Sequence, residues 1–587
     1  MTPRIAVFTS LAILLLMSCS SSSHEDSQPN DAKQEGVSVE VFEDVTQVQD
    51  SLGEGLADDA ADLVGTDTSS HETIPDVPGD MGPAPLECPP LPVAKIRTLD
   101  EAMVEGALVP GEVLNTTAGA PFVLPAATGT EEYLVMLYDL GTARNSLHSY
   151  TVEITPEPDR HTTALSHAPV PIWKHLAQQC PERPEAPGKL PPTPPPEPGD
   201  IVTFQVPFGM LVLDVEAKAM LVTDSVVIYN DITTENPLED VTLETMQQFA
   251  ELFETVVQPR EHFFWGKESD VNGDGKVDLL FSHLVNQSEA YAFVSHCDLL
   301  DPGFCGFGNE REVIYVAIPD PEEKIHSPEA YAELIAHEFN HSIYFAHKFL
   351  FNDQPEENEN IYITEGMSGL AQDLTGYNRG NQFVASAGLS DVNDISAPDL
   401  HRFEPGAQYD PVRDGALRGA SYLFLRYVFD QADGESMEPD GTFLPSCGSQ
   451  LLHRWVNSPF TGPDLVEEVT GLSYETVIAN WFTALAVSNR PGVGTGGKVD
   501  PVYQYLPTST DPVTGNQRGM DLWGMVMGFY KLTGPAVQPI GDADGKLREG
   551  GVEYLLVKPT SAGDITLNLL TGTAPSPHVR VVRIDLP

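Results

Sequence analysis

The sequence predicts an α+β protein in which a central domain of alternating strands and helices is flanked by small β-sandwich domains and preceded by a disordered tether. Three observations predict this fold. Strand-like runs separated by turn residues lie near both ends of the folded part, helical periodicity dominates the middle, and an acidic stretch follows the N-terminus. A chain of 587 residues also exceeds one ordinary core. The expected boundaries are 1–18, 19–94, 95–200, 201–495 and 496–587.

The first 18 residues are typical of an export signal. Arg4 precedes a mostly apolar run from residue 5 to residue 17, which is too short for a stable membrane span. The run ends in Leu16-Met17-Ser18-Cys19, which resembles the lipobox of bacterial lipoproteins and implies lipidation of Cys19. The alternative is a plain secretory signal. We therefore expect an exported protein, lipid-anchored to the bacterial outer membrane or cell surface, or released from it.

Residues 20–94 are expected to form a disordered tether. They contain 17 Asp and Glu residues but a single Lys or Arg, Lys33. Such a segment buries too little apolar area to offset the entropy lost on ordering. It would hold the folded part away from the membrane.

Two β-rich regions are expected on either side of the central domain. Residues 133–138 and 149–154 predict strands before a stiff Pro-rich connector at 191–198, and residues 553–557 and 579–584 predict strands near the C-terminus. Between them, the central domain is expected to contain strands at 225–229 and 312–317, and helices at 243–256, 331–350, 364–374, 419–431 and 475–487.

The net charge of -56 excludes nucleic acid as a partner and a basic patch as a means of binding a membrane. Binding to nucleic acid requires a positive field, and so does binding to a membrane through a basic patch. A lipid anchor is therefore the expected membrane contact, and the protein is assumed to be a monomer.

The six cysteines predict disulfides, because exported proteins tend to oxidise their thiols. Cys297 and Cys305 bracket a Pro-Gly turn and predict a small closed loop. Cys88 and Cys180 could link the two ends of the first β domain, which would leave Cys447 alone. The sequence does not settle the connectivity.

The pentad His337-Glu338-Phe339-Asn340-His341 predicts a zinc site. On a helix, residues four apart differ by about 40° in direction and about 6 Å in height, so both imidazoles can face one ion. Glu338 points away from that direction and can contact a water on the metal. The alternative is a helix with two core histidines and a solvated glutamate.

Two residues compete for the third ligand position. His347 would serve if residue 344 were a Gly that turned the chain back, but Tyr344 stands there and the helix is expected to continue. Glu365 lies 24 residues after His341 on a second predicted helix, with Thr364 as its expected cap. Two His, one Glu and a water would leave the open position that hydrolysis requires. The alternative for Glu365 is an acid that interacts with a helix dipole.

The HEFNH pentad, the run TEGMSGLAQDL at 364–374 and the run RGASYLFLRY at 418–427 resemble gluzincin peptidases of the hyicolysin type. The likeness extends over roughly residues 200–490. It implies His337, His341 and Glu365 as zinc ligands and Glu338 as the catalytic base. One departure from the thermolysin-like pattern is Gly369, which stands where that pattern has an acid, four residues after Glu365; Asp373 is a candidate for the role of orienting a ligand histidine.

The expected function is a zinc-dependent endopeptidase acting on proteins or peptides, in which Glu338 takes a proton from a metal-activated water. Tyr422 is a candidate donor to the oxyanion, although a buried packing role is the alternative. The rival function is an inactive surface-attached binding or scaffold lipoprotein that keeps a zincin-like fold.

A second motif at 270–278 matches the first nine positions of a calcium loop, DxNxDGxxD. It predicts a calcium or other structural cation site whose ligands are Asp270, Asn272, Asp274, Lys276 and Asp278. The twelfth position is Phe281 instead of an acid, and the following residues predict a strand. The alternative is an Asx-rich turn held by local hydrogen bonds.

Overall fold

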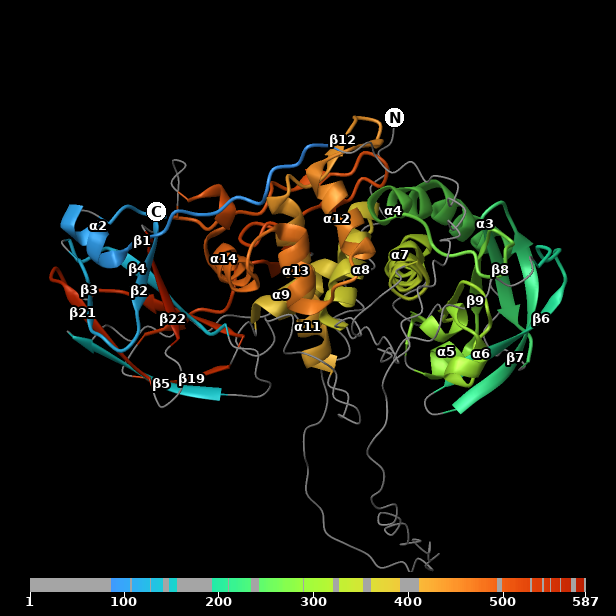
Figure 1. Ribbon diagram of the computed structural model, residues 1–587, viewed down its shortest axis with the longest axis horizontal. Coiled ribbons are helices and arrows are strands. Elements are labelled where there is room, and N and C mark those ends of the chain that lie inside the picture. Colours follow the sequence, from blue (N-terminus) through green and yellow to red (C-terminus); the bar gives the residue numbers. More distant parts are fainter. Residues whose placement is uncertain are drawn as a thin grey trace, which may run out of the picture. The chain divides into compact units, whose positions relative to one another are not determined.

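The structure, a computed structural model, shows a mixed α+β protein (Figure 1). It describes residues 86–105, 108–126, 128–140, 147–155, 193–208, 211–233, 242–288, 290–319, 327–351, 361–390, 411–493, 499–527, 530–540, 543–548, 550–559, 561–571 and 577–584. The predicted export signal, the lipidation site Cys19 and the tether up to residue 85 lie outside these residues. Within the described part of the chain, every helix is too short or too polar to cross a bilayer.

Strands from the two ends of the chain form a single β-sandwich. One sheet has the order β1-β2-β22-β4-β20-β18 and the other has the order β19-β5-β21-β3. The strands are β1 Arg97–Thr98, β2 Val113–Thr117, β3 Phe122–Leu124, β4 Glu132–Tyr138, β5 Leu147–Thr155, β18 Gln538–Pro539, β19 Ala543–Arg548, β20 Val552–Val557, β21 Ile565–Thr571 and β22 His578–Ile584. Blue N-terminal strands and red C-terminal strands lie in the same sandwich in Figure 1.

The prediction of separate β domains at 95–200 and 496–587 is therefore wrong. Strand β4 pairs on both sides with C-terminal strands, and β5 does the same. Each predicted domain alone would leave unpaired strand edges and half a core. The strands themselves were placed correctly at 133–138, 149–154, 553–557 and 579–584.

Strand β4 shows how the sandwich joins the rest of the protein. Its side chains alternate, as expected for a strand buried on both faces. Tyr133, Val135 and Leu137 belong to the core between the two sheets, whereas Leu134, Met136 and Tyr138 belong to the large core shared with the helices. On that second face, the Tyr554 hydroxyl donates to the carbonyl of Phe482 at 2.6 Å, and Arg580 Nη1 donates to the carbonyl of Ala479 at 2.6 Å.

The central domain contains a second six-stranded sheet of order β10-β11-β9-β8-β7-β6. Its strands are β6 Ile201–Phe208, β7 Leu211–Val222, β8 Val226–Asp231, β9 Val277–Phe281, β10 Ala292–Val294 and β11 Val313–Val316. Strands β8, β9 and β11 are parallel, and the others are antiparallel to their neighbours. The predicted strands at 225–229 and 312–317 are confirmed as β8 and β11.

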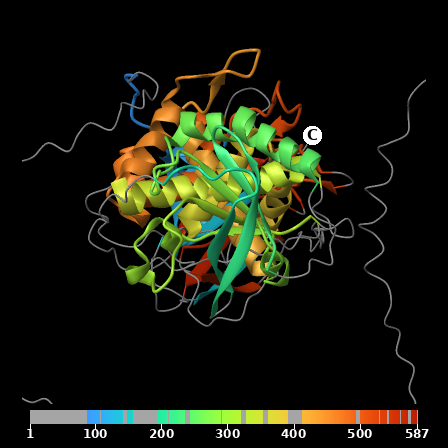
Figure 2. The same cartoon turned by 90° about the vertical axis from the view of Figure 1, so that its right-hand side faces the viewer.

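Helix α7, Pro328–Phe345, packs on one face of this sheet. Val226, Leu279 and Ile314 on that face share the large core with α7, whereas Val227, Leu280 and Tyr315 form a separate core on the other face. Figure 2 shows the sheet in front of the helices. Ser327 caps α7 by accepting from the Ala330 amide.

The other helices of the central domain are α3 Leu243–Leu252, η1 Phe253–Val257, α4 Gln258–Trp265, η3 Ala346–Phe351, α8 Ile361–Thr375, α9 Arg379–Ser390, α11 Pro411–Gln431, α12 Cys447–Asn457, α13 Gly462–Thr470 and α14 Tyr474–Val487. All five predicted helices are confirmed. Thr364 is not the cap of α8, because the helix begins three residues earlier. The remaining elements are α2 Leu99–Glu105, α5 His283–Gln287, η2 His296–Leu299, α6 Pro302–Cys305, β12 Ser436–Met437, β13 Phe443–Leu444, η4 Pro501–Tyr503, β14 Ser509–Thr510, β15 Gln517–Arg518, β16 Val526–Met527 and β17 Tyr530–Lys531.

Two glycines allow α9 and α11 to cross at very short range. A Cβ on Gly419 would lie 1.6 Å from the carbonyl oxygen of Val384, and a Cβ on Gly388 would lie 2.5 Å from the amide nitrogen of Ala420. No side chain can be accommodated at such distances without moving a helix. This crossing fixes the position of Arg418, which precedes Gly419 on α11.

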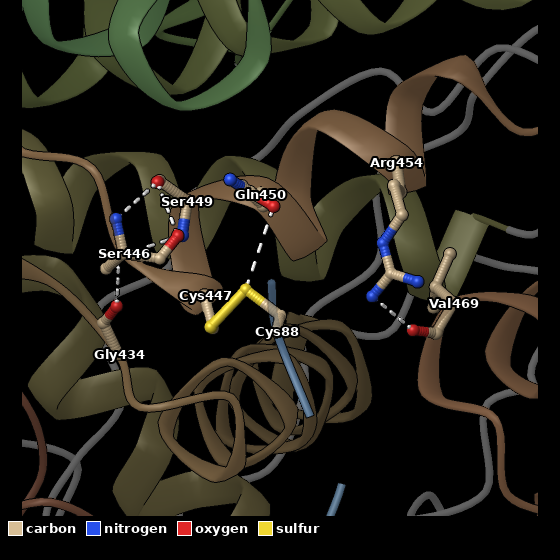
Figure 3. The surroundings of a disulfide bond; sticks show 8 residues. All are labelled: Cys88, Gly434, Ser446, Cys447, Ser449, Gln450, Arg454 and Val469. Atoms are coloured by element: carbon tan, nitrogen blue, oxygen red, sulfur yellow. Dashed lines mark hydrogen bonds between the residues drawn. A yellow bond between two sulfur atoms is a disulfide. The ribbon is translucent and has the colours of Figure 1, made fainter. Parts of the chain in front are cut away.

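The structure contains two disulfides among the described cysteines. Cys297 pairs with Cys305, as predicted. Cys88 pairs with Cys447, so the predicted pairing of Cys88 with Cys180 is wrong; Cys180 lies outside the described residues. Figure 3 shows that Cys447 lies at the start of α12, next to the capping Ser446. The bond therefore ties the beginning of the described chain to the central domain.

Candidate active site

Helix α7 brings His337, Glu338 and His341 to one buried place. The three side chains are between 2% and 7% exposed. The two imidazoles are one helical turn apart, and their Nε2 atoms lie 3.2 Å from each other. The predicted orientation of both rings toward one point is thus present.

Helix α8 places Glu365 at the same point. Glu365 Oε2 lies 3.3 Å from His337 Nε2, and Glu365 Oε1 lies 3.7 Å from His341 Nε2. Glu365 is 4% exposed. The structure therefore brings together all three residues predicted as metal ligands, from two different helices.

The donor atoms have the spacing that zinc requires. In a tetrahedral site with bonds of about 2.0–2.1 Å, neighbouring ligand atoms lie about 3.3–3.4 Å apart. The two Nε2 atoms are 3.2 Å apart, and each lies 3.3 or 3.7 Å from a different oxygen of the Glu365 carboxylate, so the separations are close to this edge length. Two imidazole nitrogens and one carboxylate also form a donor set common in catalytic zinc sites, which leave a fourth position open. These residues fit a zinc ion.

Arg418 sets the charge state of Glu365. Its Nη1 atom lies 3.1 Å from Glu365 Oε2. Burial alone would raise the pKa of the Glu365 carboxyl, but Arg418 and the two histidines lower that pKa well below its ordinary value. Glu365 is therefore held as a carboxylate, which is the form that binds a metal.

Glu338 has the opposite electrostatic environment. Burial raises the pKa of its carboxyl above the ordinary value, although the two histidines act to lower it. A carboxylate with a raised pKa accepts a proton more readily near neutral pH. Glu338 thus has the character of a general base, whereas Glu365 has that of a ligand.

The contacts behind the ligands differ from those predicted. His337 Nδ1 lies 3.4 Å from Gln372 Oε1, and Gln372 Nε2 donates to the carbonyl of Glu333. Asp373, the predicted candidate for orienting a histidine, instead accepts from Tyr422 and Arg426 at 2.9 Å each. The expectation for Asp373 is therefore wrong, because its carboxylate is directed into a buried network on the side of α11.

The two remaining candidates from the sequence lie away from the metal site. His347 is in η3, where its ring contacts Asn457 Oδ1 at 3.0 Å and the carbonyl of Lys267 at 3.1 Å, so its role is in packing. The Tyr422 hydroxyl is buried and donates to Asp373. Tyr422 therefore has the buried role, and the alternative role as donor to an oxyanion is not supported.

A pocket opens beside the ligands. The described residues that line it come from α7, α8, α9 and α11 and include, besides His337 and Glu365, the following: Leu334, Gly369, Gln372, Gly380, Asn381, Val384 and Arg418. No sequence motif marked Arg418 or Gln372 as functional. The only signal for Arg418 was its place at the start of the RGASYLFLRY run.

The loop at 270–278 is held by its own backbone. Asp270 Oδ1 accepts from the Gly275 amide, Asn272 Oδ1 accepts from the Asp274 amide, and Asp274 Oδ1 accepts from the Lys276 amide. Asp278 is buried in β9 and pairs with Arg311 at 2.8 Å. This hydrogen bonding is what the Asx-turn alternative predicts.

A second group of potential ligand atoms contains His296, Cys297 and Cys305. Both cysteines are in a disulfide, so neither offers a thiolate to a metal. The carboxylates of the loop at 270–278 do not form such a group in the described part of the structure.

No family model and no curated protein matches this chain. Among solved structures, the chain is similar to the crystal structure of a glutamate-to-alanine mutant of an M1 zinc metallopeptidase from Deinococcus radiodurans, with 11% sequence identity and a TM-score of 0.24. The match covers 48% of this chain and 52% of that one, so the chain spans about half the length of that structure. A likeness at this TM-score supports no functional argument, which leaves the geometry of the site to support one.

Proposed function

We propose that this protein is a zinc-dependent endopeptidase. The observation that supports it best is the convergence of His337, His341 and Glu365 at separations of 3.2–3.7 Å, with Glu338 on the same turn of α7. A zinc ion bound there would supply Lewis acidity to the substrate carbonyl and to a water. Glu338 would accept the proton of that water and pass it to the leaving amine.

The residues around the site support this chemistry. The ligands are held on two rigid helices, so they lose little freedom when a metal binds. Arg418 keeps Glu365 ionised, and the burial of Glu338 makes its carboxylate a stronger base. The wall of apolar side chains around α7 limits the access of bulk water, which strengthens every charge interaction at the site.

The experiment that tests the proposal measures zinc and hydrolysis in the same preparation. The protein is expected to contain one zinc ion per chain and to cleave unfolded casein internally. Removal of zinc by a chelator is expected to abolish cleavage, and added zinc to restore it. Zinc present in a folded preparation without cleavage of any peptide would favour the rival scaffold function.

A calcium ion at the loop of residues 270–278 is a second proposal. Its support is the DxNxDGxxD spacing and the oxygen-rich side chains of Asp270, Asn272 and Asp274. A cation that binds only the folded state raises its stability. We expect calcium to raise the melting temperature of the wild type but not of an Asp274→Ala variant; an equal rise in both would refute this site.

Export and attachment through Cys19 is a third proposal, supported by the apolar run and lipobox-like residues at 5–19. We expect the wild type in the membrane fraction of a bacterial host and a Cys19→Ser variant outside it. An unchanged distribution would contradict lipidation at Cys19. The substrates, under this proposal, are proteins or peptides outside the cell.

A further inference from the structure

The pocket beside the ligands has one cationic side chain among its described lining residues, Arg418. Besides Arg418 and the candidate metal ligands His337 and Glu365, the described lining residues are uncharged: Gly369, Gly380, Leu334, Val384, Asn381 and Gln372. Because two candidate metal ligands line this pocket, it lies next to the bond to be cleaved, and a substrate side chain is expected to bind in it. The inference below rests on the proposed peptidase function.

The backbone holds Arg418 firmly in this place. Arg418 is 6% exposed, and the next residue, Gly419, lies against the backbone of α9 at Val384. The close crossing of α9 and α11 therefore fixes the backbone of Arg418, and the contact with Glu365 fixes its guanidinium. A guanidinium fixed at both ends is a preorganised recognition group.

The charges favour an anion in the pocket once a metal is bound. The cluster of Arg418 and Glu365 is neutral as a pair, and a divalent ion held by Glu365 makes the cluster positive by two charges. A buried positive cluster attracts a carboxylate strongly, because the local dielectric constant is low. The net charge of -56 on the whole chain does not oppose this, since charges beyond about 8 Å are screened at physiological salt.

The shape of the pocket suits a short side chain. A Cβ on Gly369 would lie 3.1 Å from Tyr422 Cβ and 3.4 Å from Asn381 Oδ1, so the absence of a side chain there keeps the pocket open. Asn381 Nδ2 donates to the Gly369 carbonyl, and Gln372 contacts His337 and Glu333. The amide side chains of Asn381 and Gln372 thus contact other groups of the protein, and Arg418 supplies the positive charge that would recognise a substrate carboxylate.

We propose that this pocket selects an acidic substrate residue, Asp or Glu, next to the cleaved bond, with Arg418 as the specificity-determining residue. The planar guanidinium matches the two oxygens of a carboxylate, which a neutral amide cannot replace. Loss of one partner from a buried charge pair weakens binding by about 30-fold or more. The enzyme would therefore prefer Glu over Gln at that position by about 30-fold in kcat/KM.

The test begins with a peptide library and mass spectrometry, which gives the residues flanking each cut made by the zinc-loaded wild type. Two peptides that differ only by Glu or Gln at the selected position then give the ratio of kcat/KM values. Val384→Asp places a competing carboxylate in the pocket and is expected to reduce the ratio to about threefold or less, whereas the size-matched Val384→Asn is expected to keep it. Arg418→Gln is expected to bring the ratio close to one.

A binding measurement separates recognition from catalysis. The zinc-loaded Glu338→Gln protein is expected to bind the Glu peptide about 30-fold more tightly than the Gln peptide, and addition of Arg418→Gln to equalise the two. If Arg418→Gln weakened binding of the Glu peptide and of the Gln peptide by the same factor, the proposal would be overturned. Arg418 would then be a positioning residue for Glu365. Loss of the preference in Val384→Asn would also overturn it. Wild-type protein that cleaves without acidic preference refutes this inference alone, whereas wild-type protein that cleaves nothing refutes the peptidase function.

Discussion

Replacement of Glu338 by Gln is expected to lower kcat/KM for peptide hydrolysis by about 1,000-fold, while bound zinc stays at one ion per chain. General acid–base catalysis contributes about 100- to 10,000-fold, and Gln cannot accept a proton. Glu338 is buried, and burial raises the pKa of its carboxyl, so the wild-type residue is a strong proton acceptor. Because the ligand atoms belong to other side chains, the metal is retained. Steady-state kinetics and metal analysis of the same preparation check both parts.

The matched control is Glu333→Gln, on the same helix. Glu333 is also buried, and burial raises the pKa of its carboxyl to about 8, so it is largely protonated at neutral pH. Its carboxyl oxygen accepts from the Gly380 amide, a contact that a Gln oxygen can keep. We expect activity within about threefold of the wild type. If Glu338→Gln were as active as Glu333→Gln, Glu338 would not be the base.

The second large effect concerns the metal. Glu365→Ala and His341→Ala are each expected to weaken zinc binding by about 1,000-fold and to abolish hydrolysis. This loss exceeds the roughly 10- to 100-fold loss of metal affinity that follows removal of a residue hydrogen-bonded to a ligand. Each change removes one of three donor atoms that lie 3.2–3.7 Å apart. Competition titration with a zinc-binding dye measures the affinity directly.

His347→Gln is the control for this prediction. His347 is the histidine that a different ligand pattern would have used, and its ring contacts Asn457 and the carbonyl of Lys267. We expect His347→Gln to bind zinc as the wild type does, with a modest loss of stability. A loss of zinc in His347→Gln together with normal binding in Glu365→Ala would reverse the assignment of the third ligand.

The three candidate metal ligands could be predicted from the sequence because their signals are local. The spacing of His337 and His341 needs only one turn of helix, and Glu365 needed only a second helix close by. The exclusion of His347 as the third ligand also rested on local structure, since Tyr344, unlike a Gly, does not end the helix. Arg418 was missed because its role depends on the crossing of α9 and α11 at Gly388 and Gly419, which no periodicity reports.

The sandwich was mispredicted for a related reason. The apolar run of β4 and the valine-rich run of β22 predict strands but not their partners, and these two strands are more than 400 residues apart in the chain. The pairing of Cys88 with Cys447 likewise joins residues separated by 359 positions. Local patterns identified the elements, and contacts between distant segments decided how they assemble.

Zinc binding by His337, His341 and Glu365 is tested most directly by X-ray diffraction from crystals of the zinc-loaded protein, measured on both sides of the zinc absorption edge. We expect an anomalous peak bonded to Nε2 of His337, Nε2 of His341 and the carboxylate of Glu365, at about 2.0–2.2 Å from each. A fully loaded crystal whose zinc peak lies away from these three side chains would contradict this expectation.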